Sequence, residues 1–268
     1  MDYPAIASES IDVGAALITL VEPHKGHEVA YHRWYERDHF YSGCLTGPGW
    51  FAGQRWVSTK PLKDLRFPQE SPFIEDVSAG SFLSTYWILK GQETDAISWG
   101  TTQVHWLHDN DRMFEERDHV HTAMYINRWA ASRDEDGVPL PLAFEHRFKG
   151  LVTVMVDRHE DTAPRAFSAW LREVALPNAM KDTSWALTAA LTPIPLPPDA
   201  PVDQPLNPNP DRRMALLCFL DDDPREDFGV FATFAQAVEE GGLGVVSYVA
   251  PFIPTVPGTD THVDEIWE

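Results

Sequence analysis

The chain has 268 residues, 43% of them hydrophobic and 12% aromatic, which is enough apolar surface for one large domain or two small ones. Acidic side chains outnumber basic ones by 41 to 21, and the formal net charge of -20 repels phosphate backbones and anionic lipid, so nucleic-acid and membrane partners are not expected. The two cysteines, Cys44 and Cys218, provide neither a disulfide framework nor a CxxC metal pair, and they predict a reducing, cytoplasmic location.

The first half of the chain predicts the element order β-α-β-β-α-β. Runs of apolar, aromatic and β-branched residues predict strands, and apolar residues at helical spacing predict helices. The predicted strands cover residues 15–21, 50–59, 81–91 and 119–129, and the predicted helices cover residues 27–42 and 92–116, the second with a break near Asn110.

The second half predicts the same order. A strand at residues 150–158 precedes a helix at 164–174, where the early Pro164 costs little because an N–H there would have no helical partner. The remaining predicted elements are strands from residue 184 and at 214–222, a helix at 224–242 and a last strand at 243–253.

The two halves therefore look like repeats, residues 1–140 and 141–268. Trp50 and Ser184, which begin corresponding strands, lie 134 residues apart, and a period of that length indicates a duplicated domain. The tetrapeptide Glu-Arg-Asp-His occurs at 36–39 and 116–119. These two positions do not correspond to each other in the repeat alignment, so the recurrence of the tetrapeptide is a coincidence and no evidence of duplication. The proline-rich segment 192–211 is predicted to be a stiff, extended surface loop.

This pattern resembles the dimeric α+β barrel superfamily, including its EthD-like proteins. Members commonly carry W-Y-x-x-x-H-x-P on the first helix, then PGF and a strand that ends near an arginine. Here Trp34-Tyr35, His39, the segment 48–50 (Pro-Gly-Trp) and Arg55 match, while Tyr41 replaces the proline. The resemblance implies an α+β fold in which two ferredoxin-like βαββαβ repeats form a pseudo-dimeric α+β barrel.

His39 is the leading candidate for catalysis. An imidazole titrates near neutral pH and can move protons in a reaction. The equivalent residue of the second repeat is Ala175, so we expect the first repeat to carry the site. A structural role, in which His39 caps the last carbonyl groups of its helix or fills the core, is the alternative.

The segment His-Val-His-Thr-Ala-Met-Tyr at 119–125 supplies a second group. Strict alternation along a strand puts His119, His121 and Tyr125 on one face, and we expect this face to meet the helices because the other face is more apolar. Superfamily members that act on small aromatic molecules often place their pocket there. His121 and Tyr125 are then predicted to share a cavity with the first helix, whereas His119 is expected to lie too far from His39 to cooperate with it. Hydrogen bonding within the helix–sheet interface is the alternative role.

The eleven histidines raise the question of a metal or haem. His105 with His108 and His119 with His121 have helix and strand spacing, but zinc needs three or four converging ligands, so no metal site is predicted. Some superfamily members bind haem through a single histidine, and His39 and His121 are the candidates for that alternative. The sequence contains no G-x-G-x-x-G, Walker or G-x-S-x-G motif, which disfavours Rossmann, P-loop and serine-hydrolase activities.

We therefore expect an enzyme that acts on a small hydrophobic or aromatic molecule by histidine general acid/base chemistry, without an organic cofactor. Dehydration, cyclisation, isomerisation and decarboxylation belong to this class. His39 would move the proton, and His121 with Tyr125 would stabilise an enolate-like oxygen. The substrate-binding candidates are Trp34, Tyr35, Arg55, Trp87 and His119.

Two other functions stay open at this point. One is a haem- or metal-dependent oxidoreductase or monooxygenase on the same scaffold, and the other is a non-catalytic protein that only holds a ligand. Exposed sheet edges would also allow a homodimer of the pseudo-dimer.

Overall fold

The computed structural model describes residues 11–194 and 210–268. The first repeat contains β1 (Val13–Pro23), α1 (Glu28–Trp34), β2 (Trp50–Val57), α2 (Lys60–Lys63), β3 (Phe82–Leu89), α3 (Glu93–Asp109) and β4 (Arg117–Ser132). Apart from the short α2, this is the predicted order. Residues 110–116, expected to continue the second helix, form a loop instead, and Asp111 adopts a left-handed backbone conformation with φ of 55° that a helix cannot contain.

The second repeat contains β5 (Gly150–Arg158), α4 (Pro164–Trp170), α5 (Leu176–Met180), β6 (Trp185–Pro193), β7 (Arg213–Leu220), α6 (Gly229–Glu240) and β8 (Gly244–Pro254). The last helix begins five residues later than expected, because the Asp223 carboxylate holds the backbone N–H of Arg225 in a turn at 2.9 Å. Most of the proline-rich segment 192–211 lies outside the described residues.

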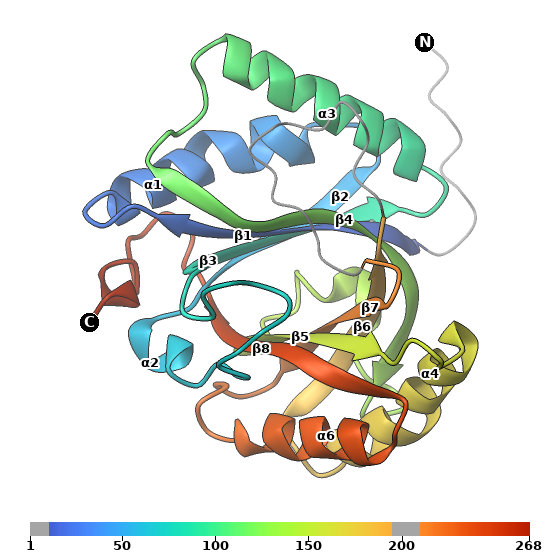
Figure 1. Cartoon of the computed structure of the whole chain (residues 1–268). Coiled ribbons are helices and arrows are strands. Elements are labelled where there is room, and N and C mark those ends of the chain that lie inside the picture. The colour runs from blue at the N-terminus through green and yellow to red at the C-terminus, as the bar shows by residue number, and fades with distance from the viewer. Residues whose placement is uncertain (1–10, 195–209) are drawn as a thin grey trace.

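The eight strands of the described chain close into one barrel with the order β1-β3-β2-β8-β5-β7-β6-β4. Each repeat supplies four consecutive strands, and the pairs β2–β8 and β6–β4 join the repeats. Helices α1 and α3 cover the first-repeat strands, and α4 and α6 cover the second-repeat strands on the opposite side (Figure 1). The predicted pseudo-dimeric α+β barrel is confirmed. Because every strand has a neighbour on both sides, the sequence-based argument for a homodimer through free sheet edges does not hold.

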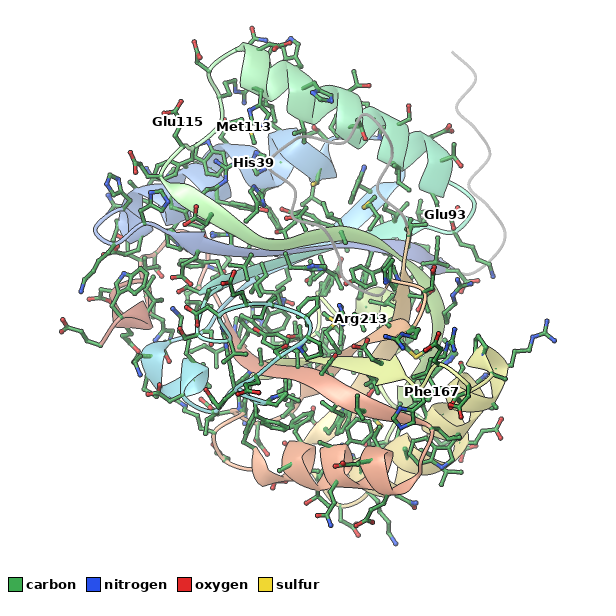
Figure 2. All side chains as sticks on the ribbon, viewed as in Figure 1. His39, Glu93, Met113, Glu115, Phe167 and Arg213 are labelled. Carbon is green, nitrogen blue, oxygen red and sulfur yellow. The ribbon has the colours of Figure 1, made fainter. Side chains whose placement is uncertain are left out.

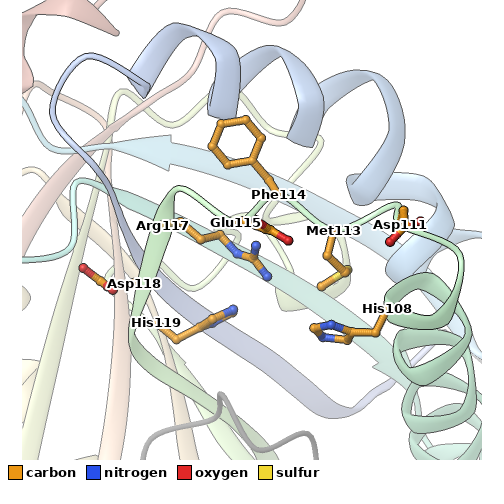
Figure 3. Close-up of a pocket in the computed structure, with 8 residues that line it drawn as sticks. All are labelled: His108, Asp111, Met113, Phe114, Glu115, Arg117, Asp118 and His119. Carbon is orange, nitrogen blue, oxygen red and sulfur yellow. The ribbon is translucent and has the colours of Figure 1, made fainter.

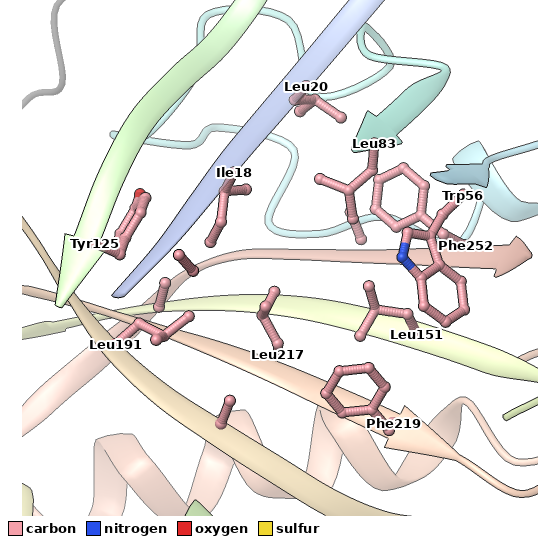
Figure 4. Close-up of a cluster of buried hydrophobic side chains, with 14 of the residues drawn as sticks. Ile18, Leu20, Trp56, Leu83, Tyr125, Leu151, Leu191, Leu217, Phe219 and Phe252 are labelled. Carbon is pink, nitrogen blue, oxygen red and sulfur yellow. The ribbon is translucent and has the colours of Figure 1, made fainter. Parts of the chain in front are cut away.

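Three apolar clusters hold the fold together. The largest fills the barrel, where side chains such as Ile18, Trp56, Leu217 and Phe252 interdigitate (Figure 4). A second lies between the second-repeat strands and their helices, and a third lies between the first-repeat strands and theirs. Within residues 11–194 and 210–268, no helix combines the length and apolarity needed to cross a membrane.

The first helix of each repeat widens into a π-helical segment at the same place. In the first repeat α1 continues as π-helix at Tyr35–His39, and in the second α4 continues as π-helix at Leu171–Ala175. Trp34 and Trp170 directly precede these segments, so the structure supports the alignment that pairs His39 with Ala175. π-Helical turns are rare and often occur at functional sites. A second π-helical segment, Tyr41–Leu45, follows in the first repeat.

Candidate functional site

The helix–sheet layer of the first repeat, between α1 with its π-helical extension and strands β1 to β4, contains buried polar groups. One row of residues crosses the sheet beneath α1. Thr19 of β1 pairs with Thr122 of β4 and with Ser84 of β3, and Ser84 pairs with Arg55 of β2. All four side chains are buried. Burying polar groups is costly without partners, so their alignment in one row calls for an explanation.

The equivalent row of the second repeat is apolar throughout. Strand for strand it consists of Val154, Val249, Leu216 and Ala190. These residues belong to the apolar cluster under α4 and α6. The two repeats share a backbone but not the chemistry of this layer, so the polar row is a feature of the first repeat and not of the fold.

Arg55 lies at the end of the polar row and is 4% exposed. Its Nη1 donates to Nδ1 of His32 at 3.1 Å, and His32 Nε2 in turn donates to the carbonyl oxygen of Thr259 at 2.9 Å. The guanidinium carbon lies 4.5 Å from the ring centre of Tyr35, a cation–π contact that partly compensates its burial. Nε and Nη2 have no hydrogen-bond partner among the described residues.

His39 ends the first π-helical segment, as the last residue of the Tyr35–His39 span. Its ring stacks on Trp34 at 4.6 Å and meets the edge of Tyr35 at 5.1 Å. Gly43 packs against it, since a Cβ there would come within 3.0 Å of the imidazole. Burial, with the nearby charges of Arg117 and His119, lowers the pKa of His39 to about 3. The ring is therefore neutral at physiological pH, and its buried Nδ1 has no partner in the described part of the chain.

A cavity of about 450 Å³ adjoins this layer, where the loop after α3 enters β4. It is lined by His108, Asp111, Met113, Phe114, Glu115, Arg117, Asp118 and His119. Arg117, His119, Met113 and His108 point towards one another across it (Figure 3). Figure 2 places His39 and Met113 on the same side of the barrel.

Aromatic contacts connect the cavity with His39. Phe114, which lines the cavity, lies 5.6 Å from Trp34 and 5.9 Å from Tyr31, measured between ring centres. The Arg117 guanidinium lies 5.3 Å from the Trp34 ring. Since Trp34 also stacks on His39, one aromatic residue separates the cavity from the neutral imidazole.

The predicted orientation of His121 and Tyr125 is wrong. The face of β4 that packs under the helices carries Met124 and Ile126, so His121 and Tyr125 on the other face lie in the barrel. A β-bulge shifts the β1–β4 register between Leu20 and Val21 and separates His119, which lies on the helix face, from this pair. The extra residue breaks the two-residue alternation between His119 and His121, which were expected to share a face. Nε2 of His121 and the hydroxyl of Tyr125 are hydrogen-bonded at 2.8 Å.

Trp87 is also inside the barrel, stacked on Phe144 at 4.3 Å. Of the eight predicted site residues, the structure therefore brings five to the helix–sheet layer and its cavity and leaves three in the barrel interior. The five are Trp34, Tyr35, His39, Arg55 and His119.

The burial of His121 predicts an acid-sensitive fold. Burial and the charge of Arg213 lower the pKa of His121 to about 3, from 6.5 for a free side chain. As the pH falls, His121 is therefore protonated in the unfolded chain before it is protonated in the folded protein. The free energy of unfolding decreases as the pH falls from about 6.5 towards 3. Between pH 7.5 and pH 5 this amounts to about 2 kcal/mol. Urea unfolding at the two pH values should show a clearly smaller loss in His121→Gln than in the wild type; an equal loss would contradict the assignment.

Several residues of the first-repeat helix–sheet layer were not identified from the sequence. Thr19 and Ser84 stand inside apolar strand segments, and a polar residue on a helix-facing strand position was the only available signal. Tyr31 lies one helical turn before Tyr35 and shares its face, which makes it detectable. Phe114 and Arg117 follow the end of α3, which comes earlier than expected. The helical periodicity of the sequence therefore does not predict that they lie at the site.

The histidines do not converge on a metal. No group of three or more His, Cys, Asp or Glu side chains suitable for an ion occurs among residues 11–194 and 210–268. The β-bulge sends His119 and His121 to opposite faces of the sheet, so this pair cannot share a ligand.

Comparison of sequences matches no protein-family model and no curated protein. Solved structures do match the fold. An anthrone oxidase-like protein aligns over 91% of this chain and 92% of its own, with a TM-score of 0.52 and 9% identity. A mutant chlorite dismutase from Candidatus Nitrospira defluvii aligns over 96% of this chain and 97% of its own, with a TM-score of 0.54 and 8% identity. At such low identity the likeness concerns the fold alone: this chain has the dimeric α+β barrel fold, with both halves of the barrel in one polypeptide.

Proposed function

We propose that this protein is an enzyme that removes a proton from a small hydrophobic or aromatic molecule, with His39 as the general base. The observation that carries the proposal is the neutral imidazole of His39, whose buried Nδ1 has no partner among the described residues. It lies in an aromatic layer, with Trp34 between it and a cavity of about 450 Å³. The site lies within the first repeat, residues 1–140, and the motif that resembles EthD-like proteins contributes four of its residues, Trp34, Tyr35, His39 and Arg55.

The residues around His39 suit it to this role. An imidazole that stays neutral at physiological pH is available to accept a proton. A negative charge that develops on a bound substrate stabilises the imidazolium and raises its pKa at that moment. Trp34 and Phe114 offer flat apolar surfaces for an aromatic substrate, while Arg55 and His119 are the polar groups that can orient it.

Once deprotonated, the substrate would then react with molecular oxygen. The fold comparison favours this second step, because one structural neighbour is described as anthrone oxidase-like. An activated CH₂ group that loses its proton can react with O₂ to give a carbonyl group and water. The substrate supplies all four electrons in that reaction, so no external reductant is needed. Isomerisation or cyclisation would begin with the same proton transfer.

The test separates proton removal from the later oxidation of the deprotonated substrate. Enolisable aryl ketones and polycyclic phenols would be incubated with the protein in D₂O, and deuterium incorporation at the acidic carbon would be followed by NMR while an electrode records O₂ uptake. We expect deuterium incorporation, or O₂ consumption with a ketone product, for part of the panel. A panel without exchange or oxygen uptake above the protein-free rate would contradict the proposal.

A haem-dependent oxidoreductase is the second candidate, but the described residues do not fit a porphyrin. In the first repeat the rings of Trp34 and Tyr35 lie against His39. The surrounding layer is filled by further rings in mutual contact, with Tyr31 to Tyr35 at 5.7 Å and Phe40 to Tyr86 at 5.2 Å. In the second repeat the equivalent layer is packed with apolar side chains, and Ala175 replaces the histidine. The other candidate ligand, His121, bonds to Tyr125 inside the barrel.

We therefore expect the protein purified from a host supplied with iron and haem precursor to absorb only through its aromatic side chains. The measurement is an ultraviolet–visible spectrum of the protein as isolated, with a pyridine haemochrome assay as control. A stoichiometric Soret band would show that the aromatic layer opens for a porphyrin, and would make His39 a candidate iron ligand.

A further inference from the structure

The layer beneath α1 contains several hydrogen-bonding atoms that nothing in the described structure satisfies. Arg55 Nε and Nη2 and the buried hydroxyl groups of Tyr31 and Thr19 make no hydrogen bond of good geometry with the described residues. The Tyr31 hydroxyl lies close enough to Arg55 for the guanidinium to act on its pKa in the lowering direction, against the larger effect of burial. A buried polar group without a partner costs about 1–3 kcal/mol, and more when it is charged. Because three such side chains lie together, this layer is the candidate site for a ligand that would satisfy them.

The unpaired charge in this layer is positive. No ion pair to Arg55 is formed within residues 11–194 and 210–268. Asp38 pairs with Arg112. Glu36 accepts from the backbone N–H of Gly258 at 2.9 Å through one oxygen, and its other oxygen lies 3.7 Å from Nε2 of His32, the histidine that binds Arg55. A protein whose net charge is -20 thus holds a buried guanidinium at this point without a direct ion pair, with a carboxylate only on the far side of His32.

The orientation of Arg55 is fixed from outside the layer. His32 accepts from Arg55 at Nδ1, so its proton is on Nε2, where it donates to Thr259 of the C-terminal segment. That segment is held on α1 by a bidentate pair between Arg33 and Asp260. With Nη1 committed to His32, the remaining donors Nε and Nη2 form the edge of the guanidinium that commonly binds a planar oxyanion.

We propose that the substrate of this site is an acidic phenol or enol, bound as its anion with the oxyanion on Nε and Nη2 of Arg55 and on the hydroxyl of Tyr31. This inference rests on the proposed function and names its substrate class. Phe114 lines the cavity and lies 5.9 Å from Tyr31 between ring centres. We therefore place the ring of the ligand beside Phe114 and its oxygen on Arg55, which requires the aromatic side chains that fill the layer to move apart when the ligand binds.

The inference is tested with 4-nitrophenol, whose anion is yellow and whose neutral form is not. Spectrophotometric pH titration of the probe with excess protein gives its pKa in the bound state. An opposite charge within hydrogen-bonding distance lowers the pKa of an acid by about 1–3 units, and we expect a shift of that size. The expected result in Arg55→Met is a bound pKa equal to or above that of the free probe.

Three variants make the result specific. Arg55→Met replaces a buried charge by an apolar chain of similar size, a change that is often neutral for stability, and a thermal unfolding curve will show whether it folds. Tyr31→Phe removes one donor and should reduce the shift without abolishing it, which keeps the test valid if Arg55→Met does not fold. Arg225→Met, an exposed arginine of the second repeat that pairs with Asp223, should leave the shift unchanged.

Failure of this inference differs from failure of the proposed function. Absence of 4-nitrophenol binding, a bound pKa that is unchanged or raised, or a shift that persists in both Arg55→Met and Tyr31→Phe would overturn the inference. His39→Gln should retain the shift, because His39 makes no hydrogen bond to Arg55. Deuterium exchange that survives without a probe shift would leave His39 as the base and discard only the anionic substrate class.

Discussion

Replacing His39 by Gln is expected to lower the rate of substrate proton exchange by roughly 10²–10⁴-fold, the usual contribution of a positioned general base. Gln fills much of the same space between Trp34 and Gly43 but cannot accept a proton at neutral pH. The measurement is the initial rate of deuterium incorporation into the best substrate of the panel, with ligand binding followed separately by tryptophan fluorescence. Binding should be retained within a few fold, since the aromatic contacts remain.

His121→Gln is the matched control for this experiment. His121 is also buried, and its pKa is likewise lowered to about 3, but it lies inside the barrel, bonded to Tyr125. We expect its exchange rate to stay close to that of the wild type. Equal losses in both variants would point to a general effect on folding, and an unchanged rate in His39→Gln would show that His39 is structural. Ligand binding without any turnover in the wild type would favour the non-catalytic alternative.

Replacing Asp157 by Asn is expected to lower the free energy of unfolding by about 3–5 kcal/mol, because it leaves a buried arginine without its counter-charge. Asp157 accepts from Nε and Nη2 of Arg213 at 2.9 and 2.7 Å. Arg213 is 2% exposed and its guanidinium lies 4.8 Å from the ring of Phe73. Urea denaturation at pH 7.5 measures the change.

Asp222→Asn provides the comparison for that result. Asp222 pairs with Lys149 at 2.8 Å, but both side chains are exposed, and such pairs contribute about 0–1 kcal/mol. A double variant in which Asp157 becomes Leu and Arg213 becomes Met should recover most of the lost stability, since apolar replacements of buried pairs are often neutral. Equal costs for Asp157→Asn and Asp222→Asn would show that the barrel pair is solvated.

The contrast between Arg55 and Arg213 supports the assignment of the site. Both are buried arginines on strands, and both make cation–π contacts. Arg213 has a bidentate carboxylate, as a structural arginine usually does, whereas Arg55 has a neutral histidine and two donors left over. Sequence alone cannot distinguish them, because partners so distant along the chain are brought together only by the fold.

Local patterns in the sequence determined the element order, the duplication and one helix with Trp34, Tyr35 and His39 on it. These features depend on periodicity and on residues a few positions apart, which sequence displays directly. The pairing of His39 with Ala175 also follows from the repeat, and the two π-helical segments support it.

Tertiary structure alone decided which groups share the site. The packing of Met124 and Ile126 under the helices puts His121 and Tyr125 in the barrel. One extra residue in β4 separates His119 from them and leaves it beside the cavity, since a bulge locally breaks the alternation of a strand. The lowered pKa of His39 and the unpaired donors of Arg55 arise from burial among side chains of several elements. Desolvation depends on all the atoms that surround a group in space, so a local pattern in the sequence does not reveal it.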